Sequence, residues 1–487
     1  MAERHARVAR QDSSGDTRTA AHEPFVRGLG LWDATAVVAG SMIGSGIFIV
    51  SADIARQVGA PGWLLVVWGL SALMTIIGAL SYGELAAMMP HAGGQYVYLR
   101  EAYGPLAGFL YGWTLFLVIQ TGTIAAVAVA FAKFTAALLP AFDAMFHIGP
   151  LSVSAQQCVA IAVIAALTAA NCNGLHTGRW VQNVFTVTKV GALLALILFG
   201  VLVGRNTAAL QANFGDFWGT APLSLAVLPL VGAAMVGALF SSDAWNNITF
   251  AAAEVRDPAR TVPLSLMIGT SLVSGLYIAA NLVYLAALPL VGQAGAATAF
   301  ARGIQFASSD RVATAAVEVT LGQAGAVLMA LAIMISTFGC VNGLVLAGAR
   351  VYYAMAQDRL FFPAAAFLNT RRVPAAALVL QGIWAALLTL SGTYSDLLDY
   401  VIFAALLFYV LTVGAVFILR RTAPAMPRPY RAFGFPIVPA AYVGLAALIM
   451  LDLLVVKPRY TWPGLLIVAS GVPVFYWWHA RHSTARR

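Results

Sequence analysis

The sequence predicts an all-α polytopic membrane protein with twelve transmembrane helices, and three observations lead to this prediction. Hydrophobic residues make up 61% of the 487-residue chain and charged residues only 10%, whereas soluble domains contain about 25% charged residues. Twelve apolar segments are each long enough to cross a bilayer, which takes about 20 residues. Two of them, the first and the sixth, are interrupted by residues that favour a break in the helix.

The twelve segments follow one another along the chain with mostly short connections. They cover 32–58, 63–89, 104–139, 155–173, 179–204, 223–254, 262–290, 323–356, 374–391, 396–420, 434–456 and 462–479. The third and the eighth exceed what a bilayer requires, which indicates that they tilt or extend beyond it. Residues 291–321 are expected to form an outer loop with some helical structure.

Basic residues predict the orientation of these segments. With the N-terminus inside, twenty Lys and Arg residues fall on the inner side and five on the outer side. Since inner loops of membrane proteins are enriched in basic residues, both termini are expected to be cytoplasmic. Residues 1–31 are then a disordered cytoplasmic tail, and residues 480–487 form a short C-terminal one.

The first interruption is the stretch Gly40-Ser41-Met42-Ile43-Gly44-Ser45-Gly46. Three glycines in seven residues weaken a helix, and a broken backbone at membrane depth needs a protein-lined cavity or a ligand to satisfy it. A break after Ile43 turns the N–H groups of Gly44, Ser45 and Gly46 toward the gap, where they favour a carboxylate. The free carbonyls of Met42 and Ile43 are expected to face the same gap and to accept bonds from an ammonium.

The second interruption, Phe240-Ser241-Ser242-Asp243-Ala244-Trp245-Asn246-Asn247, lies in the sixth segment. Carbonyls of Phe240, Ser241 and Asp243 are further acceptors for an ammonium. A ligand that binds the N–H donors through a carboxylate and the carbonyl acceptors through an ammonium is a zwitterion. An amino acid therefore fits this site better than a sugar, an ion or a drug. The alternative, that small residues merely let helices pack closely, is less favoured because two breaks occur at matching places.

The second interrupted segment comes five spans after the first, so a five-helix repeat would start from opposite sides of the membrane. This is typical of inverted-repeat transporters, which hold their substrate between broken helices. Residues 32–204 and 223–420 are the two expected repeats, and residues 434–479 contain the last two helices.

Lys189 lies in the middle of the fifth segment, where a cation costs at least ~2.5–3.5 kcal/mol. Gln182, Thr186 and Lys189 share one helical face, which we expect to point into the bundle. The eighth segment carries small residues on a comparable face: Ser336, Cys340, Gly343 and Ala347. The alternative is a lysine that extends to the membrane surface, which its mid-span position disfavours.

The first interruption, continued by Ile47-Phe48, resembles the first-helix signature of the amino acid–polyamine–organocation transporters. Other family-like stretches are Tyr82-Gly83-Glu84-Leu85, Gly93-Gly94-Gln95-Tyr96-Val97-Tyr98-Leu99, Trp245-Asn246 leading to Glu254-Val255, Arg350 through Ala356, and Arg428-Pro429-Tyr430-Arg431. The likeness is greatest to the L-type amino acid transporter branch. It implies the LeuT fold, with ten helices in two inverted repeats plus two.

The resemblance also implies roles for single residues. Lys189, beside Ser336, would replace the sodium ion that sodium-coupled relatives hold between the first and eighth helices. Phe240 would cover the bound substrate, unless it only packs, and Asn246 would help to shape the pocket. Asp243 stands where close relatives often have glycine, and it either contacts a basic side chain or bonds the unwound backbone or water. Glu84 and Glu254 are expected to pair with loop arginines.

These observations predict a sodium-independent amino acid transporter of the plasma or inner membrane that works by alternating access. The substrate is expected to be a neutral amino acid moved by exchange. Alternatives are a proton-coupled permease or an antiporter of cationic amino acids or polyamines, and, less favoured, a non-transporting sensor, since both tails are short. No catalytic constellation, metal site, cofactor motif or nucleic-acid partner is indicated. No covalent glycoprotein partner is expected, since residues 140–154 contain no cysteine.

Overall fold

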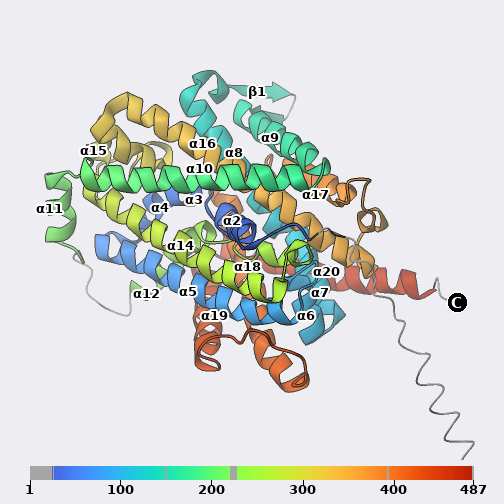
Figure 1. Cartoon of the computed structure of the whole chain (residues 1–487). Helices are drawn as coiled ribbons and strands as arrows, with labels where there is room; N and C mark the ends of the chain where they lie inside the picture. Colours follow the sequence, from blue (N-terminus) through green and yellow to red (C-terminus); the bar gives the residue numbers. More distant parts are fainter. Residues whose placement is uncertain (1–24, 26, 149–150, 220–226, 392–393, 485–487) are drawn as a thin grey trace, which may run out of the picture.

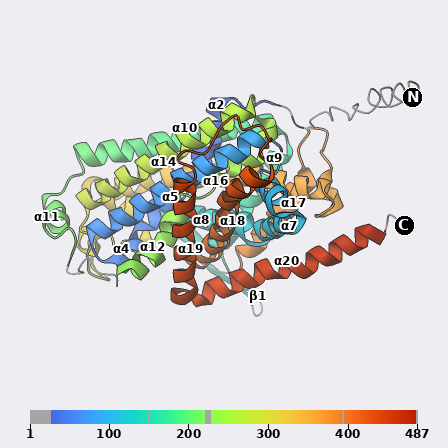
Figure 2. The same cartoon turned by 90° about the horizontal axis from the view of Figure 1, so that it is seen from below.

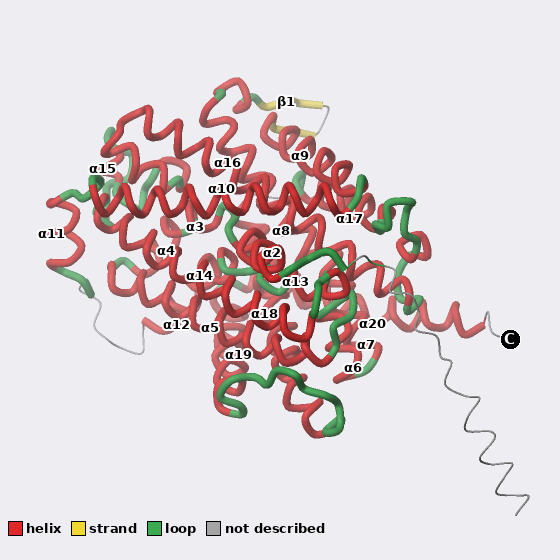
Figure 3. Tube along the Cα trace, viewed as in Figure 1, coloured by secondary structure: helices red, strands yellow, loops and turns green. Residues whose placement is uncertain are grey.

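The computed structural model describes residue 25 and residues 27–148, 151–219, 227–391 and 394–484. Nearly all regular structure in this part of the chain is helical (Figure 3). The predicted tail 1–31 lies largely outside the described residues, as do residues 223–226 of the predicted sixth span and 485–487 of the C-terminal tail.

The first half of the chain forms α2 (Leu31–Met42), α3 (Gly46–Ile49), α4 (Ser51–Val58), α5 (Pro61–Met88), α6 (Gln95–Tyr103), α7 (Pro105–Thr114), the π-helical η1 (Leu115–Ile119), α8 (Gln120–Leu138), η2 (Pro140–Asp143), α9 (Ala155–Cys172) and α10 (Leu175–Leu202). The second half forms α11 (Thr207–Gly215), α12 (Val227–Ser241), α13 (Asn247–Phe250), η3 (Ala252–Glu254), α14 (Pro258–Ala287), α15 (Ala299–Arg302), η4 (Ser308–Asp310), α16 (Val312–Gln357), η5 (Pro363–Ala366), α17 (Ala375–Leu388), α18 (Tyr394–Thr422), α19 (Ile437–Val456) and α20 (Pro458–Thr484).

Within the described residues, nine helices are long and apolar enough to cross a membrane. They correspond to nine of the twelve predicted spans. The predicted sixth and ninth spans give shorter apolar helices, α12 and α17, and the predicted twelfth span lies in α20. The protein is therefore a multi-pass helical membrane protein.

Both predicted interruptions are present. The first helix ends at Met42, Ile43 is extended with ψ 92°, and the chain becomes helical again at Gly46. The sixth helix ends at Ser241 and resumes at Asn247. Between these ends Ala244 has φ +63°, a left-handed conformation that favours glycine.

Two features differ from the predicted elements. A two-stranded antiparallel hairpin, β1 (Met145–Ile148) and β2 (Leu151–Ser154), lies before α9, so the protein is not entirely α-helical. Its second strand ends at Ser154, which caps α9 by accepting a hydrogen bond from the Gln157 N–H. The predicted eighth span also begins earlier, because α16 continues back through a kink at Gly322 (φ +61°) to Val312.

In the view of Figure 1, α2 lies near the middle of the bundle, beneath α10. α2 contacts α10, α14 and α16, while α12 contacts α4, α5, α18 and α19. α10 and α20 lie on opposite sides of the bundle in Figure 2. This arrangement surrounds both broken backbones with side chains of other helices, as broken helices at membrane depth require.

Candidate functional site

Lys189 of α10 reaches the end of the first half of the first helix. Its ammonium donates hydrogen bonds to the carbonyls of Gly40 and Ile43, the latter at 2.9 Å. The Ser336 hydroxyl of α16 lies 3.3 Å from the carbonyl oxygens of Ile43 and Gly44 and donates its one proton to one of them at a time. Lys189 is only 1% exposed, so its face points into the bundle, as the sequence predicts.

Tyr277 of α14, which was not among the predicted site residues, lies between the two interruptions. Its hydroxyl oxygen is 3.0 Å from the Met42 carbonyl and 3.0 Å from the Ser241 carbonyl. A hydroxyl has one proton, so it donates to one of these carbonyls at a time and links the two broken helices. A stripe of buried polar residues at helical spacing could have indicated this face of α14: Thr270, Ser274, Tyr277, Asn281 and Tyr284.

The expectation of free carbonyls at Met42 and Ile43 is wrong. The Ile43 carbonyl accepts from Lys189 and lies within hydrogen-bond distance of the Ser336 hydroxyl, and the Met42 carbonyl lies within hydrogen-bond distance of the Tyr277 hydroxyl. An unpaired buried carbonyl is costly, so side chains of neighbouring helices satisfy these groups. The Met42 carbonyl has a second lone pair for a further donor, whereas the Ile43 carbonyl is bonded by Lys189 and approached by Ser336.

The second half of the first helix begins at the predicted glycines. The N–H of Phe48 donates to the Ser45 carbonyl at 3.1 Å and that of Val50 to the Gly46 carbonyl at 2.9 Å. The N–H groups of Gly44, Ser45 and Gly46 therefore precede the hydrogen-bond ladder of this half-helix, at its positive end. Here the two interruptions approach each other closely, because Gly46 packs against Ser241.

Replacing Gly46 by alanine should destabilise the fold. The added Cβ would lie 2.7 Å from the Cβ and 2.9 Å from the Cα of Ser241, and relieving such overpacking costs about 1–3 kcal/mol. We expect Gly46→Ala to lower the melting temperature of the purified protein. Gly69→Ala is the matched control, since Gly69 lies within α5 and its Cβ would meet no atom within 4 Å. Equal melting temperatures for the two variants would contradict the close approach.

Three adjoining cavities surround Asp243. The first lies between the two interruptions, the second lies toward α8, and the third lies toward α5 and α19. The first is lined by Ser41, Met42, Gly44, Ser45, Gly46, Thr123, Val127, Phe240, Ser241, Asp243, Ala244 and Cys340. It thus brings together most of the predicted site residues, while Ile43, Lys189 and Ser336 are not part of its lining, and Asn246 lines the second cavity.

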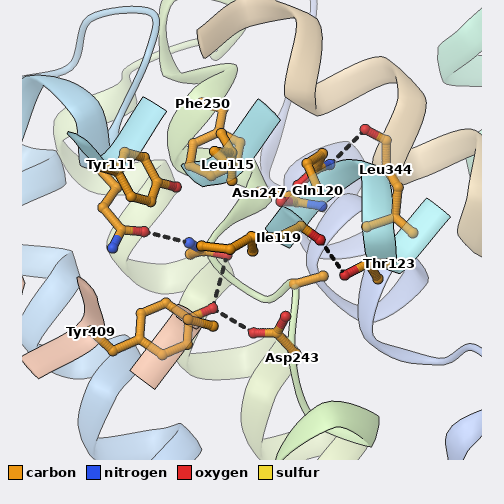
Figure 4. Close-up of a pocket in the computed structure, with 14 residues that line it drawn as sticks. Tyr111, Leu115, Ile119, Gln120, Thr123, Asp243, Asn247, Phe250, Leu344 and Tyr409 are labelled. Carbon is orange, nitrogen blue, oxygen red and sulfur yellow. Dashed lines mark hydrogen bonds between the residues drawn. The ribbon is translucent and has the colours of Figure 1, made fainter. Parts of the chain in front are cut away.

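Asp243 contacts a tyrosine instead of a basic side chain. The Tyr409 hydroxyl of α18 donates to its carboxylate at 2.5 Å and lies 3.4 Å from the Asn246 side-chain oxygen (Figure 4). The Asn246 amide in turn donates to Gln95 at 2.9 Å, and Gln95 donates to Thr412 at 3.0 Å. This network connects the second interruption to α6 and α18.

Glu84 and Glu254 are buried and paired with arginines, as predicted. Glu84 accepts from Arg420 at 2.9 and 2.6 Å, and Arg428 lies 3.6 Å away. Glu254 accepts from Arg350 at 2.9 Å. The prediction of loop arginines holds only for Arg428, because Arg350 and Arg420 belong to α16 and α18.

Comparison with known proteins assigns the family. The model of the amino acid permease family matches residues 29–476. The large neutral amino acids transporter small subunit 2 of Rattus norvegicus is 30% identical over 467 residues, which cover 93% of this chain and 81% of the relative. The b(0,+)-type amino acid transporter 1 of Homo sapiens is 28% identical over 460 residues, covering 92% of this chain and 87% of the relative. The chain belongs to the amino acid permease family.

Proposed function

We propose that this amino acid permease exchanges neutral amino acids across the membrane without sodium. The observation that carries the proposal is the cavity between the two interruptions, which is lined by Gly44, Ser45 and Gly46 of the first and by Phe240 and Ser241 of the second. The substrate carboxylate binds the N–H groups of Gly44, Ser45 and Gly46 at the positive helix end. The substrate ammonium binds the remaining lone pairs of the Met42 and Ser241 carbonyls, beside Ile43. Phe240 covers the substrate, and Asp243 and Asn246 complete the pocket.

We further propose twelve transmembrane helices with two inverted five-helix repeats, 32–204 and 223–420, followed by residues 434–479. Contacts of equivalent helices support this arrangement. α10, the fifth span, contacts α2 of the first span and α16 of the eighth. α18, the tenth span, contacts α12 of the sixth and α8 of the third. In two five-helix repeats the first span is equivalent to the sixth, the third to the eighth and the fifth to the tenth. The contacts of α10 with the first and eighth spans therefore correspond to the contacts of α18 with the sixth and third spans.

Sodium independence follows from the ammonium of Lys189. A fixed cation that bonds the Gly40 and Ile43 carbonyls, next to the Ser336 hydroxyl, occupies the place of a metal ion between the first and eighth spans. A sodium ion there would meet like charge in a buried site, where such repulsion is strong. The permease therefore moves its substrate by alternating access without a coupled sodium ion.

The distribution of basic residues supports a cytoplasmic location of both termini, with the tails 1–31 and 480–487. We propose the plasma or inner membrane as the location of the protein. A disulfide-linked glycoprotein partner is not part of the proposal. Residues 140–154, between the third and fourth spans, contain no cysteine, and Cys158 lies within α9.

Uptake into proteoliposomes tests the proposal. Purified protein is reconstituted into vesicles that are empty or preloaded with unlabelled leucine, with sodium or potassium outside, and labelled leucine uptake is measured. We expect uptake only into preloaded vesicles and equal rates in both salts. A requirement for sodium would contradict the role of Lys189, and uptake into empty vesicles driven by a pH gradient would favour proton coupling. Binding without any uptake would contradict transport.

The buried carboxylate of Asp243 supports a second candidate function, the transport of cationic amino acids or polyamines or coupling to protons. Among the described residues, the ion pairs leave Asp243 without a basic partner, and three cavities meet at its side chain. A cationic substrate side chain could therefore bind there.

Replacing Asp243 by asparagine distinguishes the two candidates. Asparagine retains a side-chain oxygen for Tyr409, so we expect leucine exchange to stay within about twofold of the unmodified protein. Lysine should be a poor counter-substrate for both proteins in the same preloaded vesicles. Strong lysine exchange that is lost in Asp243→Asn would favour the cationic substrate, and a loss of pH-driven uptake in this variant would favour the proton.

A further inference from the structure

The second cavity holds two buried polar groups without a partner. In the described part of the chain, the Asn247 side-chain nitrogen and the Tyr111 hydroxyl have no hydrogen-bond partner. Both residues line this cavity, and the Tyr111 hydroxyl points toward its centre, where Asn247 also lies (Figure 4). Buried polar groups in proteins nearly always have a partner, so these two leave hydrogen-bonding capacity for a ligand in this cavity.

A π-helical turn places Tyr111 and Thr123 around the same cavity. The third span changes from α7 to the π-helix η1 (Leu115–Ile119) before α8 continues. The Leu117 carbonyl in this turn accepts from the Trp384 indole of α17 at 2.9 Å. π-Helical turns occur frequently at functional sites, and this one places residues on both of its sides against the cavity: Tyr111, Leu115, Ile119, Gln120 and Thr123.

The second cavity adjoins the proposed site for the substrate backbone. Thr123, Asp243 and Ala244 line both this cavity and the one between the interruptions. A substrate whose carboxylate and ammonium lie between the interruptions therefore directs its side chain past Ala244 toward Asn247 and Tyr111.

We propose that the second cavity receives the substrate side chain and that Asn247 and Tyr111 select side chains that end in a carboxamide, as in glutamine. This inference rests on the proposed function. The carboxamide oxygen accepts hydrogen bonds from the Asn247 amide and the Tyr111 hydroxyl, while its NH₂ group donates to the Asp243 carboxylate. A hydrocarbon side chain satisfies none of these groups. An ammonium has donors only and leaves the Asn247 donor unpaired.

Competition in the exchange assay tests this selectivity. Leucine-preloaded vesicles take up labelled leucine while unlabelled glutamine, leucine, methionine or lysine is added outside, and the half-inhibitory concentration of each is measured. We expect glutamine to compete better than methionine, which is similar in length but lacks the amide. Tyr111→Phe and Asn247→Leu should each weaken glutamine competition about tenfold relative to methionine competition, the effect of one lost hydrogen bond in a buried site.

Tyr352→Phe is the matched control. The Tyr352 hydroxyl is also buried without a partner, but Tyr352 does not line any of the three cavities, so all competitors should keep their affinities. If Asn247→Leu does not fold, Tyr111→Phe, which removes a single atom, gives the same test. The selectivity proposal is overturned if both variants weaken all competitors equally, or if glutamine does not compete better than methionine with the unmodified protein. Absence of exchange for every amino acid would instead overturn the proposed function.

Discussion

Replacing Lys189 by methionine should nearly abolish amino acid exchange. The Lys189 ammonium bonds the carbonyls of Gly40 and Ile43, and hydrogen bonds to charged groups contribute about 1.5–3 kcal/mol each. Losing both leaves two buried carbonyls without this donor at the point where the first helix breaks. The exchange rate of reconstituted Lys189→Met should therefore fall by roughly 100-fold or more.

Lys133→Met is the control for this prediction. Lys133 also lies within a membrane-spanning helix, α8, but it lines none of the three cavities around Asp243. We expect this variant to exchange leucine at a rate close to that of the unmodified protein. Both variants are compared as monodisperse protein in detergent before reconstitution, so that a folding defect is separated from a transport defect. Full exchange by Lys189→Met would show that the ammonium is dispensable.

Local sequence patterns predicted the features that depend on neighbouring residues. Clustered glycines within an apolar segment predicted the first break, because glycine weakens a helix wherever it lies. A charge in the middle of a span predicted that the face of Lys189 points into the bundle, because a cation is costly in lipid. In both cases the physical cause acts within a few residues, so the pattern is visible in the sequence.

Contacts between distant residues were not predictable in this way. Tyr277 reaches the Met42 carbonyl across 235 positions, and Tyr409 reaches Asp243 across 166. Nothing near Met42 indicates that a tyrosine satisfies its carbonyl, so the sequence suggested a free acceptor. The π-helical turn Leu115–Ile119 is a run of apolar residues without a local signal. Side chains from distant helices thus complete the site, and they decide which backbone groups remain for a substrate.

The buried pair of Arg350 and Glu254 connects these distant parts and should contribute strongly to stability. The two side chains are 2% and 1% exposed and 2.9 Å apart. The Glu254 carbonyl also accepts from the Leu29 N–H at 3.0 Å, and the Arg256 N–H donates to the Leu29 carbonyl at 2.8 Å. The pair therefore holds the segment before the first helix and the end of the sixth to α16.

Arg350→Met leaves the Glu254 carboxylate buried without its cation, which typically costs about 3–5 kcal/mol. We expect a large drop in the melting temperature of the purified protein. Arg350→Met/Glu254→Leu should recover much of it, because the double variant buries no unpaired charge. Arg56→Met is the control, since Arg56 and Asp310 are 34% and 36% exposed and such surface pairs contribute only about 0–1 kcal/mol. Equal drops for Arg350→Met and Arg56→Met, or a larger drop for the double variant, would mean that burial of the charge is not what makes this pair important.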